Sequence, residues 1–485
     1  MAAMFGSLDD IIDDIHDAPD GADVAAFFDF DNTLIAGYSV QAFLREQLAS
    51  GEMTPREFRI QATAAARFSL GRIGFSGLVA ATAKSLRGQA EFKFEEFGER
   101  VYRKHVAGAI YPEAREILNA HREKGHTIAI VSSATRYQIE PAARELDIEY
   151  ILCTELKVED GVFTGEVIRP TCWGEGKRIA GEAFAEDFGI DMSQSYFYTD
   201  SQEDLPLLEA VGRPRPLNPN AKLARIARRH SWPRYKFKSR GRATLGQIAR
   251  TSAVYGAMPT VVGATLPIWA LTGRKRDALN TAFGLWADYS TAIAGIDMEI
   301  EGEKNLWAAR PAVFIFNHQS SLDGLLIAKL LRRDYTGIGK KELANSPLVG
   351  PVFRFADIIF IDRSDTTKAI EAMEPVVKAL REDNLSVVLA PEGTRSPARK
   401  LGRFKKGAFH IAMQAKAPLV PIVIHNAADS LPKGRMIAKP ATIQVTVLPP
   451  IDTSKWKADK VDSYVEDVRN LFLETLGQAE QAVSA

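Results

Sequence analysis

The sequence predicts a protein of two α/β domains joined by apolar helices. Short apolar strand candidates alternate with helical stretches in both halves of the chain. In the first half this alternation indicates a parallel sheet covered by helices on both faces. The 485 residues suit roughly two to four domains. With 46% hydrophobic and 25% charged residues, the composition is that of a globular protein and excludes a fibrous or wholly disordered chain.

The strand candidates of the first half are short apolar runs. They lie at residues 24–28, 127–131, 150–153, 195–199 and 213–217, and a small hairpin is predicted at 161–167. Residues 37–108 are mostly helical in pattern and follow the first strand directly. We therefore expect a helical cap over the carboxyl edge of the sheet, within a first domain formed by residues 1–220.

A basic segment and an apolar segment follow this domain. Residues 221–250 contain ten Lys or Arg and no Asp or Glu, and we interpret them as a basic linker. Residues 251–273 are uncharged and long enough to span a bilayer. They contain Pro259 and Pro267, which favours a helix lying in the membrane interface, or partly re-entrant, over one straight spanning helix. A buried core helix is the remaining alternative.

Residues 277–296 continue as an amphipathic helix with Trp286 and Tyr289, side chains that suit the interfacial layer of a membrane. The sequence therefore predicts that residues 251–296 are membrane-docking helices, with flanking cations that favour an anionic surface. Aromatic residues also interleave with cations in the basic segment, as in single-strand nucleic-acid binders. We consider nucleic acid the less favoured partner, because the basic segment directly precedes an apolar helix.

The remaining residues, 297–485, form the second predicted domain. Its first strand candidate begins one residue earlier, at residue 296. Its strand candidates lie at 296–300, 312–316, 357–361, 386–390, 419–424 and 442–448. A final helix is expected at 459–483, with an apolar stripe that packs on the core.

The charge is divided unevenly between the two halves. Although the formal net charge is zero, residues 1–220 contain 22 Lys and Arg against 36 Asp and Glu, whereas residues 221–485 contain 39 against 25. An acidic half joined to a basic half indicates two modules with different partners. An anionic membrane and a nucleic acid are both candidates for the basic half.

Cysteine usage and the N-terminus indicate the compartment. Cys153 and Cys172 are the two cysteines of the chain, and they lack the spacing of a zinc site. So few cysteines fit a reducing compartment. The acidic first 21 residues lack the basic and apolar regions of a secretory signal. We expect a cytoplasmic protein, or one on the cytoplasmic face of a membrane.

Acidic residues follow two strands of the first domain. Asp29 and Asp31 come directly after strand 24–28, and Asp200 and Asp204 follow strand 195–199. The carboxyl ends of parallel strands line the crevice where open α/β sheets bind ligands, so these pairs can meet there. Carboxylate oxygens suit Mg²⁺ bound beside a substrate phosphate.

Two further side chains suit a phosphoryl group. Ser132 follows strand 127–131 with a hydroxyl donor, and Lys177 begins the helix after the hairpin with an ammonium. The segments D-F-D-N-T, I-V-S, Lys177 and T-D-S-Q-E-D occur in this order over most of the first 220 residues. They resemble the four motifs of the haloacid dehalogenase superfamily of phosphatases, with a Rossmann-like parallel sheet.

That resemblance implies the roles of the site residues. Asp29 is expected to be the nucleophile that forms an aspartyl-phosphate, and Asp31 the general acid/base. Asp29, the carbonyl of Asp31, and Asp200 are expected to hold Mg²⁺. Ser132 and Lys177 are expected to bind the phosphoryl oxygens. Asp204 is expected to support Lys177 or the metal shell.

The position of the cap resembles the phosphoserine-phosphatase branch of this superfamily. That branch carries an acidic residue shortly after its first motif, to meet the amine of the substrate. Here residues 36–39 are Ala, Gly, Tyr and Ser. We therefore expect a phosphomonoester without an amine as the substrate.

A second constellation lies in the second domain. His318 and Asp323, five residues apart at a strand-to-helix junction, can form a dyad in which the carboxylate fixes the imidazole tautomer. Arg363 and Arg395 can clamp a phosphate with paired hydrogen bonds. Gly393 allows close approach of the backbone.

The segments N-H-Q-S-S-L-D at 317–323, K-K-E-L-A-N-S-P-L-V-G with F-I-D-R at 340–363, P-E-G-T-R-S at 391–396 and V-P-I at 420–422 occur in order. They resemble the four motifs of the glycerolipid acyltransferases, specifically the 1-acylglycerol-3-phosphate acyltransferases. The resemblance implies that His318 deprotonates the sn-2 hydroxyl for direct attack on an acyl thioester, and that Asp323 orients His318. It also implies a set of residues that bind the glycerol phosphate, with assistance from Lys340 and Lys341: Arg363, Glu392, Gly393, Thr394 and Arg395.

The whole chain resembles bacterial fusions of such a phosphatase with such an acyltransferase, which implies that both act on related phosphoglycerides. Expected cofactors and substrates are Mg²⁺, lysophosphatidate, and acyl-CoA or an acyl-carrier protein as donor. The acyltransferase family often begins with a membrane-docking helix pair, and residues 251–296 match its position. In the alternative interpretation only the acyltransferase is active, and the first domain is regulatory or hydrolyses an unrelated phosphomonoester such as phosphoserine.

Overall fold

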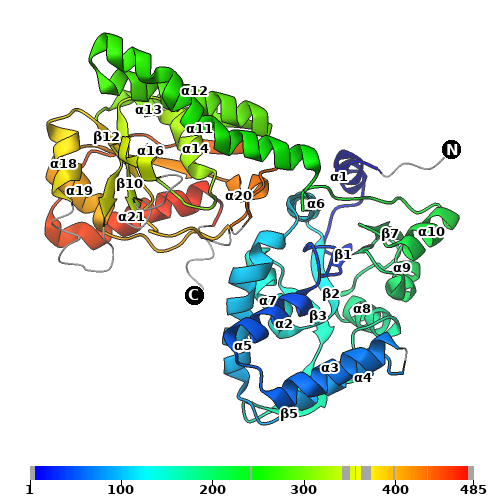
Figure 1. The fold of residues 1–485 in the computed structure, drawn as a ribbon. Helices are drawn as coiled ribbons and strands as arrows, with labels where there is room; N and C mark the ends of the chain where they lie inside the picture. Colours follow the sequence, from blue (N-terminus) through cyan, green and yellow to red (C-terminus); the bar gives the residue numbers. More distant parts are fainter. Residues whose placement is uncertain are drawn as a thin grey trace. The chain divides into compact units, whose positions relative to one another are not determined.

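The computed structural model describes residues 6–70, 72–240, 243–340, 344, 350–355, 357–361, 373–396, 399–433 and 435–478. The chain divides into two compact units, Met1–Arg242 and Ala243–Ala485. Each unit has its own sheet with helices packed on it (Figure 1). The predicted α/β class is therefore confirmed for both halves.

The first unit contains a five-stranded parallel sheet of order β3-β2-β1-β6-β7. The strands are β1 (Ala25–Phe28), β2 (Thr127–Thr135), β3 (Tyr150–Thr154), β6 (Tyr196–Thr199) and β7 (Arg213–Pro216). Each coincides with a predicted strand. The short runs of β1 and β6 are buried throughout, whereas β7 has the sequence R-P-R-P with Pro214, Arg215 and Pro216 buried. The predicted hairpin is formed by β4 (Leu156–Glu159) and β5 (Val162–Val167).

Alternate residues of β1 pack on opposite faces of this sheet. Phe27 belongs to a core that also contains residues of α8 (Glu175–Phe188) and α9 (Leu205–Ala210). Phe28 packs on the other face, against His121 of α6 (Pro112–Glu123), which in turn packs against α1 (Leu8–His16). A further helix, α7 (Arg136–Glu145), contacts β2 and β3.

The predicted cap follows β1. It consists of α2 (Ser39–Ser50), α3 (Pro55–Ser69), α4 (Phe75–Leu86) and α5 (Glu91–Val101). The hairpin β4–β5 closes the cap from the other side, with α4 lying along β5 (Figure 1). Leu86 and Phe163 are buried in the cluster that joins them.

Residues 221–240, the first part of the predicted basic linker, pack on the first unit. In α10 (Ala221–Arg229), Leu223 and Ala227 are fully buried. The backbone of Tyr235 pairs with the end of β7 and the residues just after it. Its N–H donates to Pro216 O at 3.1 Å, and its carbonyl accepts from Asn218 N at 2.8 Å. The cations of α10 therefore belong to a helix that packs on the first unit, because the apolar residues between them recur at helical spacing and are buried.

Two long helices begin the second unit. The uncharged segment lies within one helix, α11 (Leu245–Thr272), which continues through Pro259 and Pro267 and is followed by α12 (Lys275–Ala294). Within the described part of the chain, α11 is the one helix with the length and apolar composition to cross a membrane, and 11% of its apolar window is buried. α12 packs against α11 on one side and against α14 (Asp323–Leu331) on the other.

The second unit is built on a seven-stranded sheet of order β11-β10-β12-β9-β13-β14-β8. Neighbouring strands are parallel except β13 and β14. The strands are β8 (Ile296–Glu301), β9 (Val313–Phe316), β10 (Tyr335–Lys340), β11 (Ile359–Ile361), β12 (Ser386–Leu389), β13 (Leu419–Ile424) and β14 (Ala441–Val447). Sequence analysis missed only β10 among them, because Gly337 and Gly339 interrupt its apolar pattern.

Helices cover both faces of this sheet. α14 packs with α12 on one face. The other face is covered by α18 (Glu374–Arg381), α19 (Gly407–Ala415) and α21 (Val461–Thr475). Shorter helices in the connections are α13 (Asn305–Ala308), α16 (Gly350–Phe355) and α20 (Ala427–Ser430). The final helix is shorter than predicted and is followed by Gly477 at φ 67°.

Candidate active sites

The first site lies where β1, β2 and β6 end at the same edge of their sheet. Asp29 and Asp31 follow β1, the central strand, and Asp200 follows the neighbouring strand β6. The register pairs Ile130 with Phe28, so Ser132 of β2 lies level with the loop that carries Asp29 and Asp31. The structure therefore brings together residues more than 100 positions apart, as predicted.

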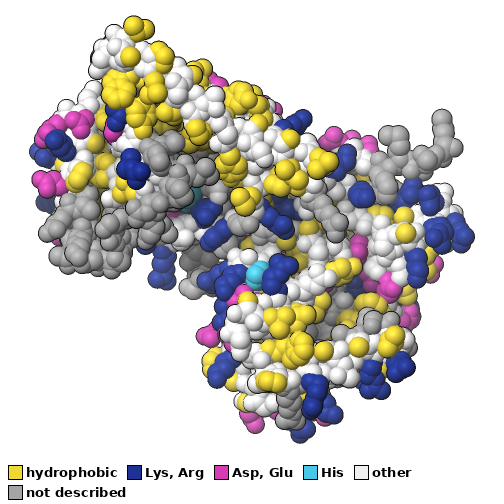
Figure 2. Space-filling view, viewed as in Figure 1, with side chains coloured by type: hydrophobic (Ala, Val, Ile, Leu, Met, Phe, Trp, Pro, Cys, Tyr) yellow, Lys and Arg dark blue, Asp and Glu magenta, His cyan; other side chains and the backbone are white. Residues whose placement is uncertain are grey.

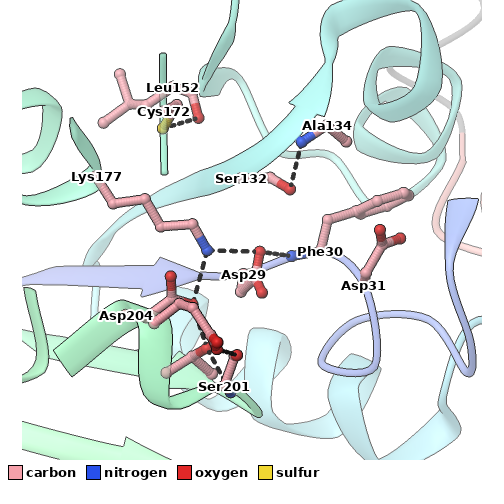
Figure 3. Close-up of polar contacts among 12 residues, drawn as sticks. Asp29, Phe30, Asp31, Ser132, Ala134, Leu152, Cys172, Lys177, Ser201 and Asp204 are labelled. Carbon is pink, nitrogen blue, oxygen red and sulfur yellow. Dashed lines mark hydrogen bonds and ion pairs between the residues drawn. The ribbon is translucent and has the colours of Figure 1, made fainter. Parts of the chain in front are cut away.

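Lys177 occupies the centre of this site (Figure 3). Its Nζ lies 3.0 Å from Asp29 Oδ1 and 2.8 Å from Asp204 Oδ2, and the Thr199 hydroxyl donates to the same Asp204 oxygen at 2.5 Å. Burial alone would lower the pKa of Lys177, but attraction to Asp204 and Asp29 outweighs it and holds this pKa above its usual value. The ammonium therefore stays charged in a site where it is only 2% exposed.

Asp31 lies on the side of Asp29 that faces away from Lys177 (Figure 3). It is held by Ser39. Its Oδ1 accepts from Ser39 N at 2.8 Å and its Oδ2 from Ser39 Oγ at 3.2 Å. Burial raises the pKa of Asp31 to about 7, with the Asp29 charge adding and the Ser39 hydrogen bonds opposing. A carboxyl group with a pKa near neutrality can both give and take a proton at physiological pH.

Excess negative charge marks this site. Burial raises the pKa of Asp200 to about 8, and the charges of Asp29 and Asp204 contribute to the shift. A divalent cation would relieve this repulsion. The expected ligands, Asp29, Asp200 and the backbone carbonyl of Asp31, include only two side chains. This set is compatible with the finding that no group of three or more His, Cys, Asp or Glu side chains among the described residues could hold a metal ion.

Cys172 lies next to this site and has no assigned role in it. Its Sγ is 3.5 Å from the Leu152 carbonyl, to which it donates (Figure 3). Burial raises the pKa of the thiol to about 12. Cys172 is therefore a neutral, buried side chain that packs behind Lys177.

The second site contains the predicted dyad. His318 Nδ1 lies 2.7 Å from Asp323 Oδ2, and the same oxygen accepts from the backbone N–H groups of Gln319 at 2.8 Å and Ser320 at 2.9 Å. Asp323 is fully buried at the first turn of α14, whereas the His318 side chain is 29% exposed. The helix terminus and two N–H donors stabilise the carboxylate. A tautomer that donates from Nδ1 leaves Nε2 as the base.

Glu392 links two of the motifs. Its Oε1 accepts from His318 N at 2.8 Å and its Oε2 from Gly402 N at 2.9 Å, and its side chain is buried. The His318 carbonyl in turn accepts from Ser396 N at 2.8 Å. Glu392 therefore holds the loop of residues 391–396 against the histidine loop, a contribution that sequence analysis did not anticipate.

Cations surround the loop of residues 391–396. Arg395 hydrogen-bonds the Ser321 hydroxyl through its guanidinium, and its carbonyl accepts from Lys433 Nζ at 2.9 Å. Gly393 has φ +72°, and a Cβ there would lie 3.0 Å from Lys405 Nζ. Burial and the charge of Arg395 lower the pKa of Lys433, as expected where cations gather. Sequence analysis missed Lys405 and Lys433, which lie outside the motifs.

Some predicted residues of this second site lie outside the described residues. They are Lys341 and Arg363. Lys340 ends β10, but its side chain is not described. Thr394 lies in the loop between Gly393 and Arg395 and is exposed. The described part of this second site therefore consists of the dyad, the loop of residues 391–396 and the cations around it.

Comparison with known families matches each unit separately. Residues 26–209 match the family described as haloacid dehalogenase-like hydrolase, and residues 297–425 match the family described as acyltransferase. The chain is 35% identical over 191 residues to the 1-acyl-sn-glycerol-3-phosphate acyltransferase of Limnanthes alba, covering 39% of this chain and 67% of that protein. It is also 35% identical to the 1-acyl-sn-glycerol-3-phosphate acyltransferase alpha of Mus musculus, covering 43% and 73%.

Among solved structures, one similar protein is the 1-acyl-sn-glycerophosphate acyltransferase from Thermotoga maritima. The match has 24% sequence identity and a TM-score of 0.41, and it covers 48% of this chain and 96% of that chain.

Proposed function

Because this chain belongs to the family of 1-acyl-sn-glycerol-3-phosphate acyltransferases and also carries a haloacid dehalogenase-like hydrolase domain, we propose that it is a bifunctional enzyme of phosphoglyceride metabolism. The second unit transfers an acyl group from a thioester, acyl-CoA or acyl-carrier protein, to the sn-2 hydroxyl of 1-acylglycerol 3-phosphate and forms phosphatidate. The first unit hydrolyses a phosphomonoester. The observation that carries the acyltransferase assignment is the 2.7 Å His318–Asp323 contact beside a cation-rich loop.

In the acyl transfer, His318 Nε2 takes the proton of the sn-2 hydroxyl as its oxygen attacks the thioester carbonyl. The carbon–sulfur bond then breaks, and the leaving thiolate takes the proton from the imidazolium. Asp323 stabilises the imidazolium and fixes the ring, since its Oδ2 is held by two backbone N–H groups. No covalent acyl-enzyme is needed.

The glycerol phosphate binds at the loop of residues 391–396. Arg395 and Gly393 supply a guanidinium and a close-approach backbone, and Lys433 adds a second cation through its contact with the Arg395 carbonyl. Thr394, Arg363, Lys340 and Lys341 complete the proposed phosphate site. Cations bind a phosphate directly here, without a metal ion.

In the phosphatase, Asp29 attacks phosphorus and forms an aspartyl-phosphate, while Asp31 gives its proton to the leaving ester oxygen. Asp31 then takes a proton from water, which attacks the aspartyl-phosphate and releases inorganic phosphate. Lys177 and Ser132 bind the phosphoryl oxygens, and Asp204 holds Lys177 in place. Asp29, Asp200 and the Asp31 carbonyl would hold Mg²⁺, which supplies positive charge against the phosphoryl oxygens.

Three phosphoglycerides are candidate phosphatase substrates: phosphatidate, lysophosphatidate and glycerol 3-phosphate. The absence of an acidic side chain at residues 36–39 disfavours phosphoserine, and the product of the second unit is itself a phosphomonoester. In the alternative, the first unit is regulatory or acts on an unrelated phosphomonoester. The charged Lys177 between two carboxylates favours an active phosphatase over this alternative.

We also propose that the protein acts on the cytoplasmic face of a membrane, peripherally or partly inserted. Support comes from α11, whose Leu245 and Leu271 are 86% and 88% exposed. Exposed apolar side chains at both ends of a helix that is uncharged after Arg250 suit an anionic bilayer, to which the cations of residues 221–250 add attraction. Nucleic acid is the less favoured partner of this segment.

A product assay tests both activities at once. The full-length protein is incubated with lysophosphatidate, acyl-CoA and Mg²⁺, beside the variants His318→Ala and Asp29→Asn. We expect diacylglycerol from the wild type, accumulation of phosphatidate with Asp29→Asn, and loss of acyl transfer with His318→Ala. If the wild type also stops at phosphatidate, the acyltransferase assignment stands and the phosphatase serves a different phosphomonoester.

A further inference from the structure

The cap presents an exposed aliphatic row on α2. Val40, Leu44 and Leu48 follow one another at intervals of four residues and are 60%, 42% and 54% exposed, so they share one face of the helix over about 12 Å. A shallow groove beside them is lined by Gln41, Leu44, Arg45, Leu48 and Ala49. Figure 2 shows hydrophobic side chains gathered over this part of the cap.

This row begins at the phosphatase site. Ser39, the first residue of α2, holds both oxygens of Asp31. The residue before it, Tyr38, has a pKa that burial and the charge of Asp200 raise, and its side chain hydrogen-bonds Asn32. The N-terminal end of α2 therefore belongs to the mouth of the site, and the aliphatic row leads away from it.

The opposite face of α2 explains why these leucines are not ordinary core residues. After Ser39, the buried residues of the helix are Phe43 and Glu46, and Glu46 pairs with Lys104 at 2.6 Å and His105 at 2.9 Å. α2 is thus anchored through its inner face. Single exposed leucines are common on protein surfaces, but a continuous aliphatic row that starts at a phosphate site offers a track for an apolar ligand group.

We propose that the row Val40–Leu44–Leu48 binds the acyl chain of a lipid phosphomonoester whose phosphate is held by Ser132 and Lys177 beside the nucleophile Asp29. This inference rests on the proposed phosphatase activity and narrows its substrate to acylated phosphoglycerides, in preference to glycerol 3-phosphate. The second unit uses and makes such molecules. Arg45 also lines the groove, and its apolar stem can add to the surface that Leu44 and Leu48 offer.

The test measures phosphate release by the full-length protein without an acyl donor. Substrates are glycerol 3-phosphate, hexanoyl- and octanoyl-lysophosphatidate below their micelle concentrations, and p-nitrophenyl phosphate as a small reference. Each buried methylene is worth about fourfold in affinity. If the exposed row buries about three to four methylenes of the octanoyl chain, kcat/KM should be about 100-fold higher for the octanoyl substrate than for glycerol 3-phosphate.

The double variant Leu44→Gln/Leu48→Gln keeps good helix formers on α2. We expect it to lower the ratio of octanoyl-lysophosphatidate to p-nitrophenyl phosphate activity about tenfold. The matched control is Ile179→Gln on α8, an aliphatic side chain 44% exposed in the same unit, which should leave this ratio within twofold of the wild type.

Five outcomes overturn the inference. Hydrolysis that does not depend on chain length retains the phosphatase but removes the acyl-chain track, and a chain-length dependence that survives in the double variant places the track elsewhere. If the dependence appears only with phosphatidylcholine vesicles, the row docks on a bilayer. If the double variant instead changes the sedimentation coefficient and leaves the ratio unaltered, the row binds a second copy. Failure to hydrolyse any of the four substrates, including p-nitrophenyl phosphate, would reject the proposed phosphatase itself.

Discussion

The two sites of this chain differ in what balances their buried carboxylates. In the first unit, Asp29, Asp200 and Asp204 surround one buried ammonium, that of Lys177, so that the described residues leave carboxylates in excess. In the second unit, the buried carboxylates of Asp323 and Glu392 accept hydrogen bonds from backbone N–H groups, and Asp323 also contacts the His318 ring. Cations gather around the neighbouring loop of residues 391–396.

The difference explains how two sites on one chain can handle a phosphate in two ways. Carboxylates in excess suit a phosphoryl group only when a metal cation stands between them. A loop rich in Arg and Lys binds the phosphate directly and leaves the histidine free for proton transfer. The net charges of the two halves of the sequence have the same signs as these carboxylates and cations: the first half is acidic and the second half is basic.

Metal removal should separate the two sites most sharply. Treatment with a chelator is expected to lower phosphate release by about 10³-fold or more, because the carboxylates then repel the substrate phosphate. Acyl transfer should change less than twofold. Phosphate release and acyl transfer are measured on one sample, and activity returns with added Mg²⁺. Equal loss of both activities would show that the second unit also needs a metal.

Asp323→Asn should lower kcat of acyl transfer by about 10²–10³-fold with little change in KM, because the imidazolium loses its stabilising charge. Steady-state kinetics with lysophosphatidate as the varied substrate measures this split. The control is Asp288→Asn, which removes an exposed ion pair with Arg332 and should leave both constants unaltered. A rise in KM alone would mean that Asp323 shapes the substrate site and does not assist the base.

Arg395→Lys should raise KM for lysophosphatidate about tenfold and change kcat less, because lysine keeps the charge but loses the planar fork of donors. The same variant should leave phosphate release by the first unit unaffected. The comparison of KM at low and high salt adds a second readout, since exposed cations are screened. An unchanged KM would place phosphate binding on the other cations of the second unit.

Gly393→Ala should destabilise the second unit by about 1–2 kcal/mol, because φ +72° disfavours a side chain and the new Cβ meets Lys405. Gly477→Ala is the matched control: Gly477 has φ +67° and nothing lies within 4 Å of its Cβ position. Denaturant unfolding of both variants separates backbone strain from crowding. If the two variants lose equal stability, the contact with Lys405 contributes nothing.

The elements that sequence patterns predicted well are the ones whose own residues determine them. β1, β6 and β13 are apolar runs buried on both faces, so composition alone marks them. β10 was missed because its glycines hide the pattern, although the strand is completed by hydrogen bonds from β11 and β12 on either side. In the basic linker, cations dominate the composition of residues 221–240, but the buried Leu223 and Tyr235 determine how this segment packs.

The same distinction applies to the sites. The motifs and their order predicted that Asp29, Asp31, Lys177 and Asp200 belong to one site and that His318 and Asp323 form a dyad. The aspartates follow strands that end at one sheet edge, and the dyad residues are close in the sequence. Ser39, Glu392 and Lys433 could not be assigned their contacts in this way, since each partners a group 8, 74 or 38 positions away. Such contacts depend on how loops and helices fold back on the sheet.

By itself, the sequence determined which chemical groups are present, their order and the two families to which the halves are related. Only the tertiary structure decided that Lys177 bridges Asp29 and Asp204, that Glu392 ties two motifs together, and that the row Val40–Leu44–Leu48 stays exposed. The physical reason is that side-chain contacts follow strand order and register, and these arise from the joint packing of the whole sheet. Local apolar patterns specify which segments are buried but do not specify which segments become neighbours.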